Sequence, residues 1–421
     1  MIAEDIGCVP STAGCCELSP EEVFCSDYDS LFTQDRLTGD WGGFRSDLKE
    51  SGVDIYASAT QFYSGVVSGG REQTDAYGGK LDYYMKVEGG KLGLNPGFFL
   101  DVHGETRYGN SVSSLDGALA PSNTAMAFPL PDEDVTALTG FTITQALSEE
   151  FAIFGGKINT LDQYPIRYSG GSGLAGFMNT SLVFNPIAAR TVPYSAAGVG
   201  VAILRDKLPM FTFTVFDPVE RSTIGFEDLF DTGVLLVPDL VLRTQFFDRP
   251  GIFNLGGTYS SKSYTSVDRS AYLSNIPGLL AGAFPQESGS WSAYSSFYQA
   301  LWVDDTDSQR NWGVFGQFGV SDGNPNPVQY VANGGIGGRS MLPGRKLDTF
   351  GAGLFYLGLS NQFQQLAGPF VPQENEYGIE TFYNYAVTRW CRLTGDLQVV
   401  NPSTISFDTA VITGMRLQVL F

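Results

Sequence analysis

The chain has 421 residues, of which 51 are glycine, 13% are aromatic and only 17% are charged, and its formal net charge is −20. That charge argues against nucleic acid as a partner, because a surface that binds nucleic acid must be basic. No run approaches the roughly 18 consecutive apolar residues of a membrane-spanning helix, whereas a mean hydropathy near zero suits a transmembrane β-barrel, whose lipid-facing and lumen-facing residues alternate.

Residues 1–36 form an acidic, cysteine-rich segment. Four of the five cysteines lie within its first 25 positions, and Cys391 lies near the other end of the chain. This density favours disulfides in an oxidising compartment, although four cysteines allow three pairings that sequence alone does not distinguish. A metal site and lipid attachment are the alternatives, but no histidine lies nearby and no apolar signal stretch precedes a cysteine. The disulfide candidates are Cys8, Cys15, Cys16 and Cys25.

Residues 37–52 predict a short periplasmic helix. Phe44 and Leu48 would share one face of this helix, and Gly52 would end it. We expect the segment to pack at the periplasmic mouth of a barrel, with Trp41 as an anchor. Arg45 is more simply a solvated side chain than a substrate contact.

From residue 53 to the end, short segments of period two follow one another. In "KLDYYMKVEG", Tyr83 and Met85 fall on one face, whereas Lys80, Asp82 and Lys86 fall on the other. Several ionisable groups in succession on the concave side of a barrel indicate an interior that holds water. Short connections alternate with long ones, which lie at 110–133, 160–195, 218–237, 265–289 and 361–373.

This alternation predicts an all-β fold, a 16-stranded antiparallel transmembrane β-barrel over residues 53–421 with an inward-folded outer loop. The even strand number depends on counting the glycine-rich stretch "VQYVANGGIGGRS" as the twelfth strand. The closing stretch "TAVITGMRLQVLF" places Met415, Leu417, Val419 and Phe421 on the lipid side. Its terminal aromatic resembles the signal that outer-membrane assembly machinery reads, although a soluble barrel could also close on such a strand.

Five stretches carry a family pattern: "LTGDWGGFRSDLKESGVDI" at 37–55, "FGGKINTLDQYP" at 154–165, "GFMNTSLVFNPIAARTVPYS" at 176–195, "GVFGQFGVSDGNPNPVQYVANGGIGGRSMLPGRKLDTFGAGLFYLGLS" at 313–360, and "YGIETFYNYAVTRWCRLTGDLQVVNP" at 377–402. In this order they resemble the carbohydrate-selective porin (OprB) family. The resemblance implies a 16-stranded barrel of the bacterial outer membrane that passes sugars by passive diffusion. Residues 1–30 are outside the family pattern.

The candidate site is the lumen together with the long loop at 160–195, which we expect to narrow the channel. Guanidinium groups and rings suit the hydroxyl pairs and apolar faces of sugars. The same side chains could instead hold the loop against the wall. If the loop folds inward, its arginines should reach wall charges such as Asp101 or Glu105. The candidates are Asp101, His103, Glu105, Arg107, Lys157, Asp162, Tyr164, Arg167, Tyr168, Arg190, Arg205, Arg243 and Arg339.

Other functions remain open: a general-diffusion or anion-preferring porin, or a structural or adhesive barrel that uses its surface loops. An enzyme is not expected, because His103 is the sole histidine and no Gly-x-Ser-x-Gly elbow is present. We expect no cofactor and no metal. The expected partners are mono- and oligosaccharides, outer-membrane lipid, lipopolysaccharide, and the assembly machinery through the strand that ends at Phe421. Oligomeric state stays open between monomer and trimer.

Overall fold

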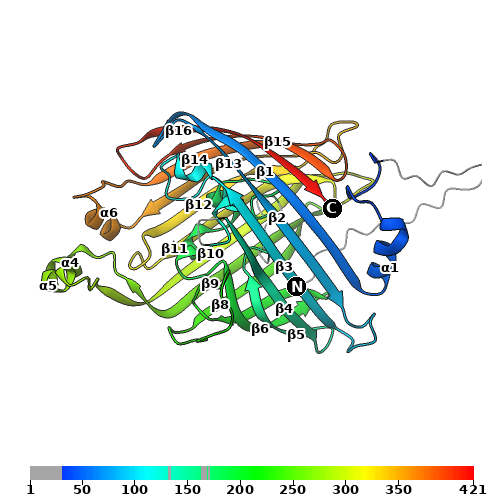
Figure 1. The fold of residues 1–421 in the computed structure, drawn as a ribbon, viewed down its shortest axis with the longest axis horizontal. Coiled ribbons are helices and arrows are strands. Elements are labelled where there is room, and N and C mark those ends of the chain that lie inside the picture. Colours follow the sequence, from blue (N-terminus) through cyan, green and yellow to red (C-terminus); the bar gives the residue numbers. More distant parts are fainter. Residues whose placement is uncertain (1–30, 131–133, 163–167, 169–170) are drawn as a thin grey trace, which may run out of the picture.

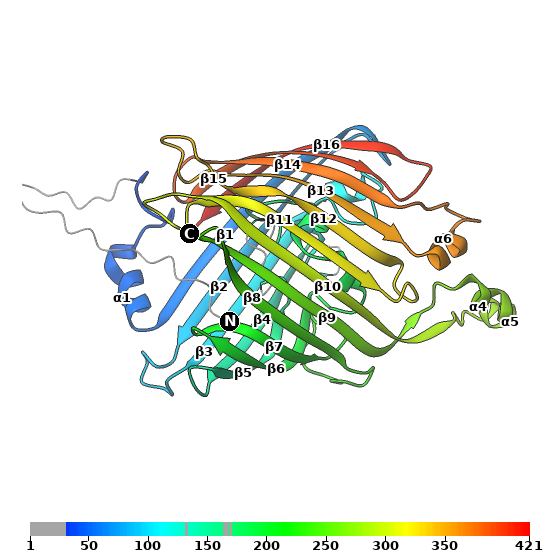
Figure 2. The same cartoon turned by 180° about the vertical axis from the view of Figure 1, so that it is seen from behind.

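The structure, a computed structural model, describes residues 31–130, 134–162, 168 and 171–421. In this part of the chain, 16 antiparallel strands form a closed barrel (Figures 1 and 2). The predicted class and strand number are confirmed, including the glycine-rich twelfth strand. The strands are β1 (Val53–Gly70), β2 (Asp75–Glu88), β3 (Phe98–Gly109), β4 (Val135–Ala146), β5 (Phe151–Asn159), β6 (Ser195–Arg205), β7 (Leu208–Phe216), β8 (Leu235–Phe246), β9 (Arg249–Thr265), β10 (Gln286–Val303), β11 (Asn311–Ser321), β12 (Val328–Arg339), β13 (Thr349–Leu359), β14 (Glu376–Ala386), β15 (Cys391–Asn401) and β16 (Asp408–Leu420).

The period of two in the sequence decides which side chains face inward. On β2, Lys80 and Asp82 are buried within the barrel, whereas the ring of Tyr83 is exposed on its outer surface. On β16, Arg416 is buried inside, and Met415 and Leu417 are exposed outside. The apolar face of the closing strand therefore lies on the outside of the barrel, the side on which the sequence predicted lipid.

The barrel closes where β16 pairs with β1, with Ala59 opposite Val419. The amide of Phe421 donates to the carbonyl of Ala57 at 2.8 Å, which extends this pairing to the last residue. The amide of Leu37 donates to the carbonyl of Leu420 at 2.8 Å, so the described part of the N-terminal segment also lies against this seam.

The helices are short. The predicted helix is present as α1 (Phe44–Glu50), at the end of the barrel where β1 begins (Figure 1). Among the described residues, no helix is long and apolar enough to cross a membrane. The four predicted disulfide cysteines lie outside the described residues. The other helices are η1 (Trp41–Gly43), η2 (Val112–Ser114), α2 (Thr124–Ala127), α3 (Thr180–Val183), η3 (Pro186–Arg190), α4 (Arg269–Ser274), α5 (Ile276–Leu280) and α6 (Asn361–Ala367).

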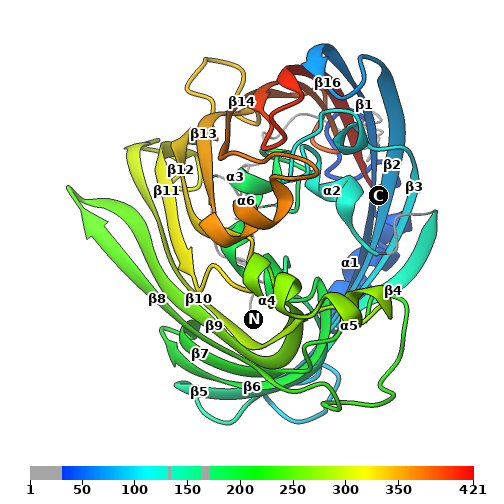
Figure 3. The same ribbon diagram turned by 90° about the vertical axis from the view of Figure 1, so that its left-hand side faces the viewer.

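Two of the long connections turn into the barrel. Figure 3 shows α2 and α3 within the outline of the strands, while α4, α5 and α6 lie at the end opposite α1 (Figure 1). The largest apolar cluster of the described residues joins α3 and its neighbours mainly to the inner faces of β10 to β16. Two smaller apolar clusters lie on β5 to β8 and around α2. Most of the buried apolar contacts of the described residues therefore lie between a loop and the wall of β10 to β16.

Candidate functional site

The connection of residues 160–194 between β5 and β6, here called the inner loop, crosses the lumen. The structure describes residues 160–162, 168 and 171–194 of it. The ring of Phe177 packs against Phe315 of β11 and Phe382 of β14, with ring centroids 5.4 and 4.9 Å apart. Leu182 is fully buried in the same cluster. The predicted inward fold of this outer loop is thus confirmed.

Charged side chains of the far wall bind the backbone of the inner loop. The carboxylate of Glu380 on β14 accepts hydrogen bonds from the amides of Met178 and Asn179 at 2.5 and 2.9 Å. The guanidinium of Arg416 on β16 donates to the carbonyl of Gly173 at 2.7 Å. The bond from the Arg416 guanidinium is charge-assisted, and such bonds are roughly twice as strong as neutral ones. The wall therefore fixes the backbone position of the inner loop independently of the side chains of the loop.

Inward-facing glycines on β13 leave room for this contact. A Cβ on Gly351 would lie 2.7 Å from the ring of Phe177, and a Cβ on Gly353 would lie 2.9 Å from Leu182. Real Cβ atoms essentially never approach other atoms below 3.0 Å. Glycines at the strand positions that face the lumen therefore indicate that a loop packs there. Our prediction did not use this signal.

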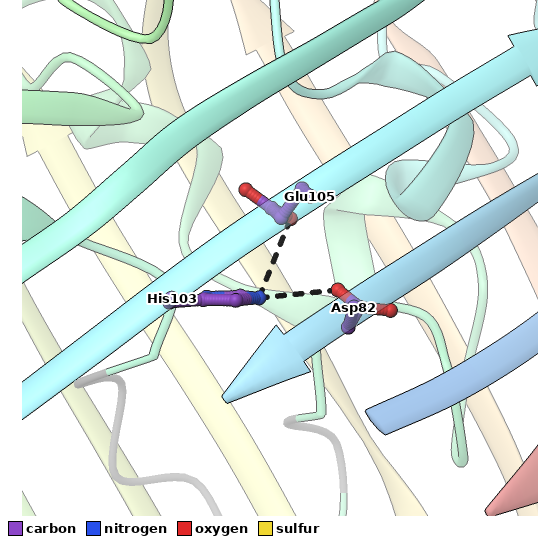
Figure 4. Close-up of side chains that lie close together, drawn as sticks. All are labelled: Asp82, His103 and Glu105. Carbon is purple, nitrogen blue, oxygen red and sulfur yellow. Dashed lines mark hydrogen bonds and ion pairs between the residues drawn. The ribbon is translucent and has the colours of Figure 1, made fainter. Parts of the chain in front are cut away.

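On the other side of the β1–β16 seam, four charged side chains meet on β2 and β3. Lys80 and Asp82 lie on β2, and His103 and Glu105 lie directly across from that strand on β3. The ammonium of Lys80 is 2.5 Å from the Glu105 carboxylate. His103 Nε2 is 3.2 Å from Asp82 and 3.9 Å from Glu105 (Figure 4). We call Lys80, Asp82, His103 and Glu105 the wall cluster.

The wall cluster is an internally paired network. Asp82, His103 and Glu105 offer three ligand atoms within 4.8 Å of one another, the donor set that a divalent cation could use. However, Lys80 already supplies a cation to Glu105, and all four side chains are buried. Removing one partner of a buried ion pair typically costs roughly 3–5 kcal/mol. As it stands, the cluster is therefore better described as a structural element than as a metal centre.

A cavity of about 1030 Å³ remains between the inner loop and the wall on the side of β1 to β5 and β7 to β10. Its charged lining includes four basic and four acidic side chains from the strands and loops: Lys86, Arg190, Arg243 and Lys262, with Asp101, Asp162, Glu220 and Asp239. The rings of Tyr84, Phe128, Tyr264 and Tyr294 also line it. Both features that the sequence predicted for the lumen, mixed charge and aromatic rings, are thus brought together here.

Aromatic stacking along β1 to β3 was missed by the sequence reasoning. Tyr56 stacks on Tyr84 with centroids 4.6 Å apart, and Tyr84 stacks on the His103 ring at 4.1 Å. The guanidinium of Arg36 lies over the other side of this stack, 5.3 Å from the centroid of Tyr56. The signal was available, because Tyr84 shares the parity of Lys80, which the alternation assigned to the lumen.

The thirteen predicted site residues separate into four groups. Those that line the cavity are Asp101, His103, Asp162, Arg190 and Arg243. Others are buried in contacts that hold loops: Glu105 in the wall cluster, Arg107 donating to the carbonyl of Met126, Lys157 donating to the carbonyl of Ser222, and Tyr168 donating to Asn311. Arg205 and Arg339 lie at strand ends and are not among the lining residues. Tyr164 and Arg167 lie outside the described residues.

The expected contact of Arg190 with Asp101 or Glu105 is corrected by the structure. Arg190 donates to the carbonyl of Thr265 at 3.2 Å and lies 5.0 Å from the ring centroid of Tyr264. Glu105 is already paired with Lys80, and the loop carries Arg190 to β9 instead. A cation held over a ring is stabilised without a carboxylate partner.

The connection of residues 110–134 also reaches the inner surface of the barrel. Glu376 on β14 accepts from the amides of Leu119 and Ala120 at 2.6 and 2.9 Å. Sequence reasoning gave this loop no role. Because its anchors are backbone amides, no side-chain pattern in the loop could have indicated them.

Comparisons with known proteins agree with this architecture. A family model described as "Carbohydrate-selective porin, OprB family" matches residues 72–421. The high-pH structure of Pseudomonas putida OprB is 19% identical, with a TM-score of 0.81, and the match covers 93% of this chain and 100% of that chain. The low-pH structure of the same protein, also 19% identical, has a TM-score of 0.57 over 92% and 99% of the chains.

A more distant structure shares the fold alone. OmpF of Salmonella typhi, in complex with daunomycin, is 9% identical with a TM-score of 0.51 over 89% of this chain and 99% of that chain. No curated protein sequence matches the chain significantly.

Proposed function

Since this chain belongs to the carbohydrate-selective porin family, OprB, we propose that sugars cross it by passive diffusion through the cavity between the inner loop and the wall of β1 to β10. The protein is accordingly a sugar channel of the bacterial outer membrane. The observation that carries the proposed path is the asymmetry of the lumen. One side is filled by the apolar contacts of the inner loop, which leaves the cavity with its charged and aromatic lining as the open side.

The lining suits a neutral, hydroxylated solute. Four basic and four acidic side chains line the cavity, so no single ionic charge is favoured throughout. Ionised groups can donate to or accept from sugar hydroxyls, and exposed ring faces can contact the apolar face of a pyranose. We infer that Arg190 and Tyr264 contribute to this surface from the loop side, and Asp101 from the wall side.

The other expected partners are also proposals. Lipid contact follows from the exposed apolar residues on the outer surface, such as Leu354 and Met415. The apolar parity of β16, ending at Phe421, supports recognition by the assembly machinery. The acidic stretch "FEDLFD" at 226–231, in the long connection between β7 and β8, is a candidate for bridging to lipopolysaccharide through divalent cations.

The first test is ion current through single channels in planar bilayers. Glucose and maltodextrins should reduce the current of the unmodified protein, with modest affinity because a channel must release what it binds. Replacing Arg190 with Ala should increase the sugar concentration needed for half-block several-fold, since a charged contact to the sugar is lost.

Arg45→Ala is the matched control. Arg45 lies on α1, donates to the carbonyl of Gly39 at 2.7 Å, and sits over the ring of Trp41, away from the cavity lining. Its removal should leave conductance and sugar block unchanged. A channel that ignores every sugar but is blocked by phosphate would replace this proposal with an anion-preferring porin.

A further inference from the structure

Both ends of the inner loop reach the same place on the wall. The loop leaves β5 after Asn159 and returns to β6 at Ser195, and each end contacts the wall cluster. The ends of a loop this long fix where its middle part can lie. The contacts at the two ends therefore bear on the width of the cavity that the loop borders.

The departing end is held through His103. Nδ1 of His103 lies 2.7 Å from a carboxylate oxygen of Asp162, while Nε2 faces Asp82 at 3.2 Å. The side-chain amide of Asn159 donates to Glu105 at 3.3 Å, next to the start of the loop. His103 is thus the link between a buried wall carboxylate and a loop carboxylate that borders the cavity.

The returning end is held through Tyr194. Its hydroxyl donates to Glu105 at 2.6 Å and accepts from Lys80 at 3.4 Å, and its ring stacks on Phe128 with centroids 4.5 Å apart. Burial and the carboxylate of Glu105 raise the pKa of Tyr194 well above its usual value, so the hydroxyl remains a donor. The Tyr194 side chain is buried at the edge of the cavity.

We propose that the wall cluster is a clamp for both ends of the inner loop, and that His103 and Tyr194 are positioning residues that set the width of the sugar path. His103 holds the start of the loop and Tyr194 holds its end, and both depend on carboxylates of adjacent strands. The far anchors at Glu380 and Arg416 fix the middle of the loop. The expected effect on sugar block rests on the proposed function. The position of the loop can be tested separately, by ion conductance in the absence of sugar.

The experiment compares single-channel conductance, current noise and the size limit for uncharged polymers in Tyr194→Phe, H103A and H103Q. Tyr194→Phe removes one hydroxyl and keeps the ring on Phe128, so the barrel should fold normally. We expect larger conductance, more noise and a larger polymer limit in Tyr194→Phe and H103A, with sugar half-block moving several-fold higher. H103Q keeps a hydrogen-bonding amide and should restore part of the original values.

Tyr83→Phe is the matched control, because the same hydroxyl is removed from a tyrosine of β2 that faces outward. It should leave all readouts unchanged. Folded Tyr194→Phe and H103A barrels, verified by heat-modifiable electrophoretic mobility, with the conductance and polymer limit of the parent would overturn the clamp. Altered conductance in these variants, with a parent channel that no sugar blocks, would support the clamp and refute the sugar path instead.

Discussion

Asp116 carries a buried carboxyl group in the connection of residues 110–134 between β3 and β4. It accepts hydrogen bonds from the amide of Ala118 at 2.8 Å and from the hydroxyl of Ser122. Burial raises the pKa of Asp116 to about 6, although these two donors oppose the shift. The folded loop therefore retains a proton at a pH where the unfolded chain has released it.

The sign of the resulting pH dependence is fixed by linkage. The pKa of Asp116 in the folded state is above its unfolded value. Its contribution to the free energy of unfolding is therefore most stabilising below about pH 4. It is lost as pH rises to about 6, by on the order of 3 kcal/mol at most. Asp116→Asn should remove this dependence. Hydrogen exchange of the 110–134 amides at pH 4 and pH 7 measures it, and an unchanged pH profile in the variant would contradict the assignment.

For His103 and Glu105, the sequence predicted which way the side chains face but not what they contact. The parity of β3 predicted that His103 and Glu105 face the lumen, and the structure places both there. Their partners, Asp162 and Tyr194, lie about 60 to 90 positions away in sequence. Nothing in the pattern of either segment encodes that pairing, because the loop path is set by backbone contacts to the far wall.

At the level of elements, β13 illustrates how a strand can be shaped to receive a loop. Gly351→Val should displace Phe177, because a Cβ at this position would lie 2.7 Å from its ring and 2.4 Å from the ring of Phe382. Overpacking typically costs about 1–3 kcal/mol. The expected result is a lower unfolding temperature together with a larger and noisier conductance.

Gly395→Val provides the comparison for this substitution. Gly395 lies on β15, and a Cβ there would meet no atom within 4 Å. The same change should therefore have little effect on conductance. If the two variants behave alike, the effect at Gly351 comes from the β-propensity of valine and not from displacement of the inner loop.

The elements differ in how well the sequence predicts them. Strands were predictable because lipid outside and water inside impose a period of two on every segment. The inner loop was predictable only in its length and residue types. The inner loop packs against Gly351 and Gly353 and binds Glu380. These residues belong to strands far along the chain, so no local sequence pattern indicates the contacts.

The two sides of the barrel have different roles. The side formed by β11 to β16 carries much of the largest apolar cluster and the backbone anchors of the inner loop. The side formed by β1 to β10 carries the wall cluster and most of the cavity lining. This division explains how one loop can be held rigidly and still border an open path.

Phe421 extends the seam between β1 and β16 beyond the strand pairing, because its amide donates to the carbonyl of Ala57 at 2.8 Å. Deleting Phe421 removes the hydrogen bond to Ala57 and one apolar side chain at the seam. We expect a lower unfolding temperature after refolding in detergent, and a further loss of folded protein in the outer membrane of cells. The cellular loss should exceed the detergent effect, because the assembly machinery is proposed to read this end. Equal losses in both settings would show that Phe421 acts only through the seam.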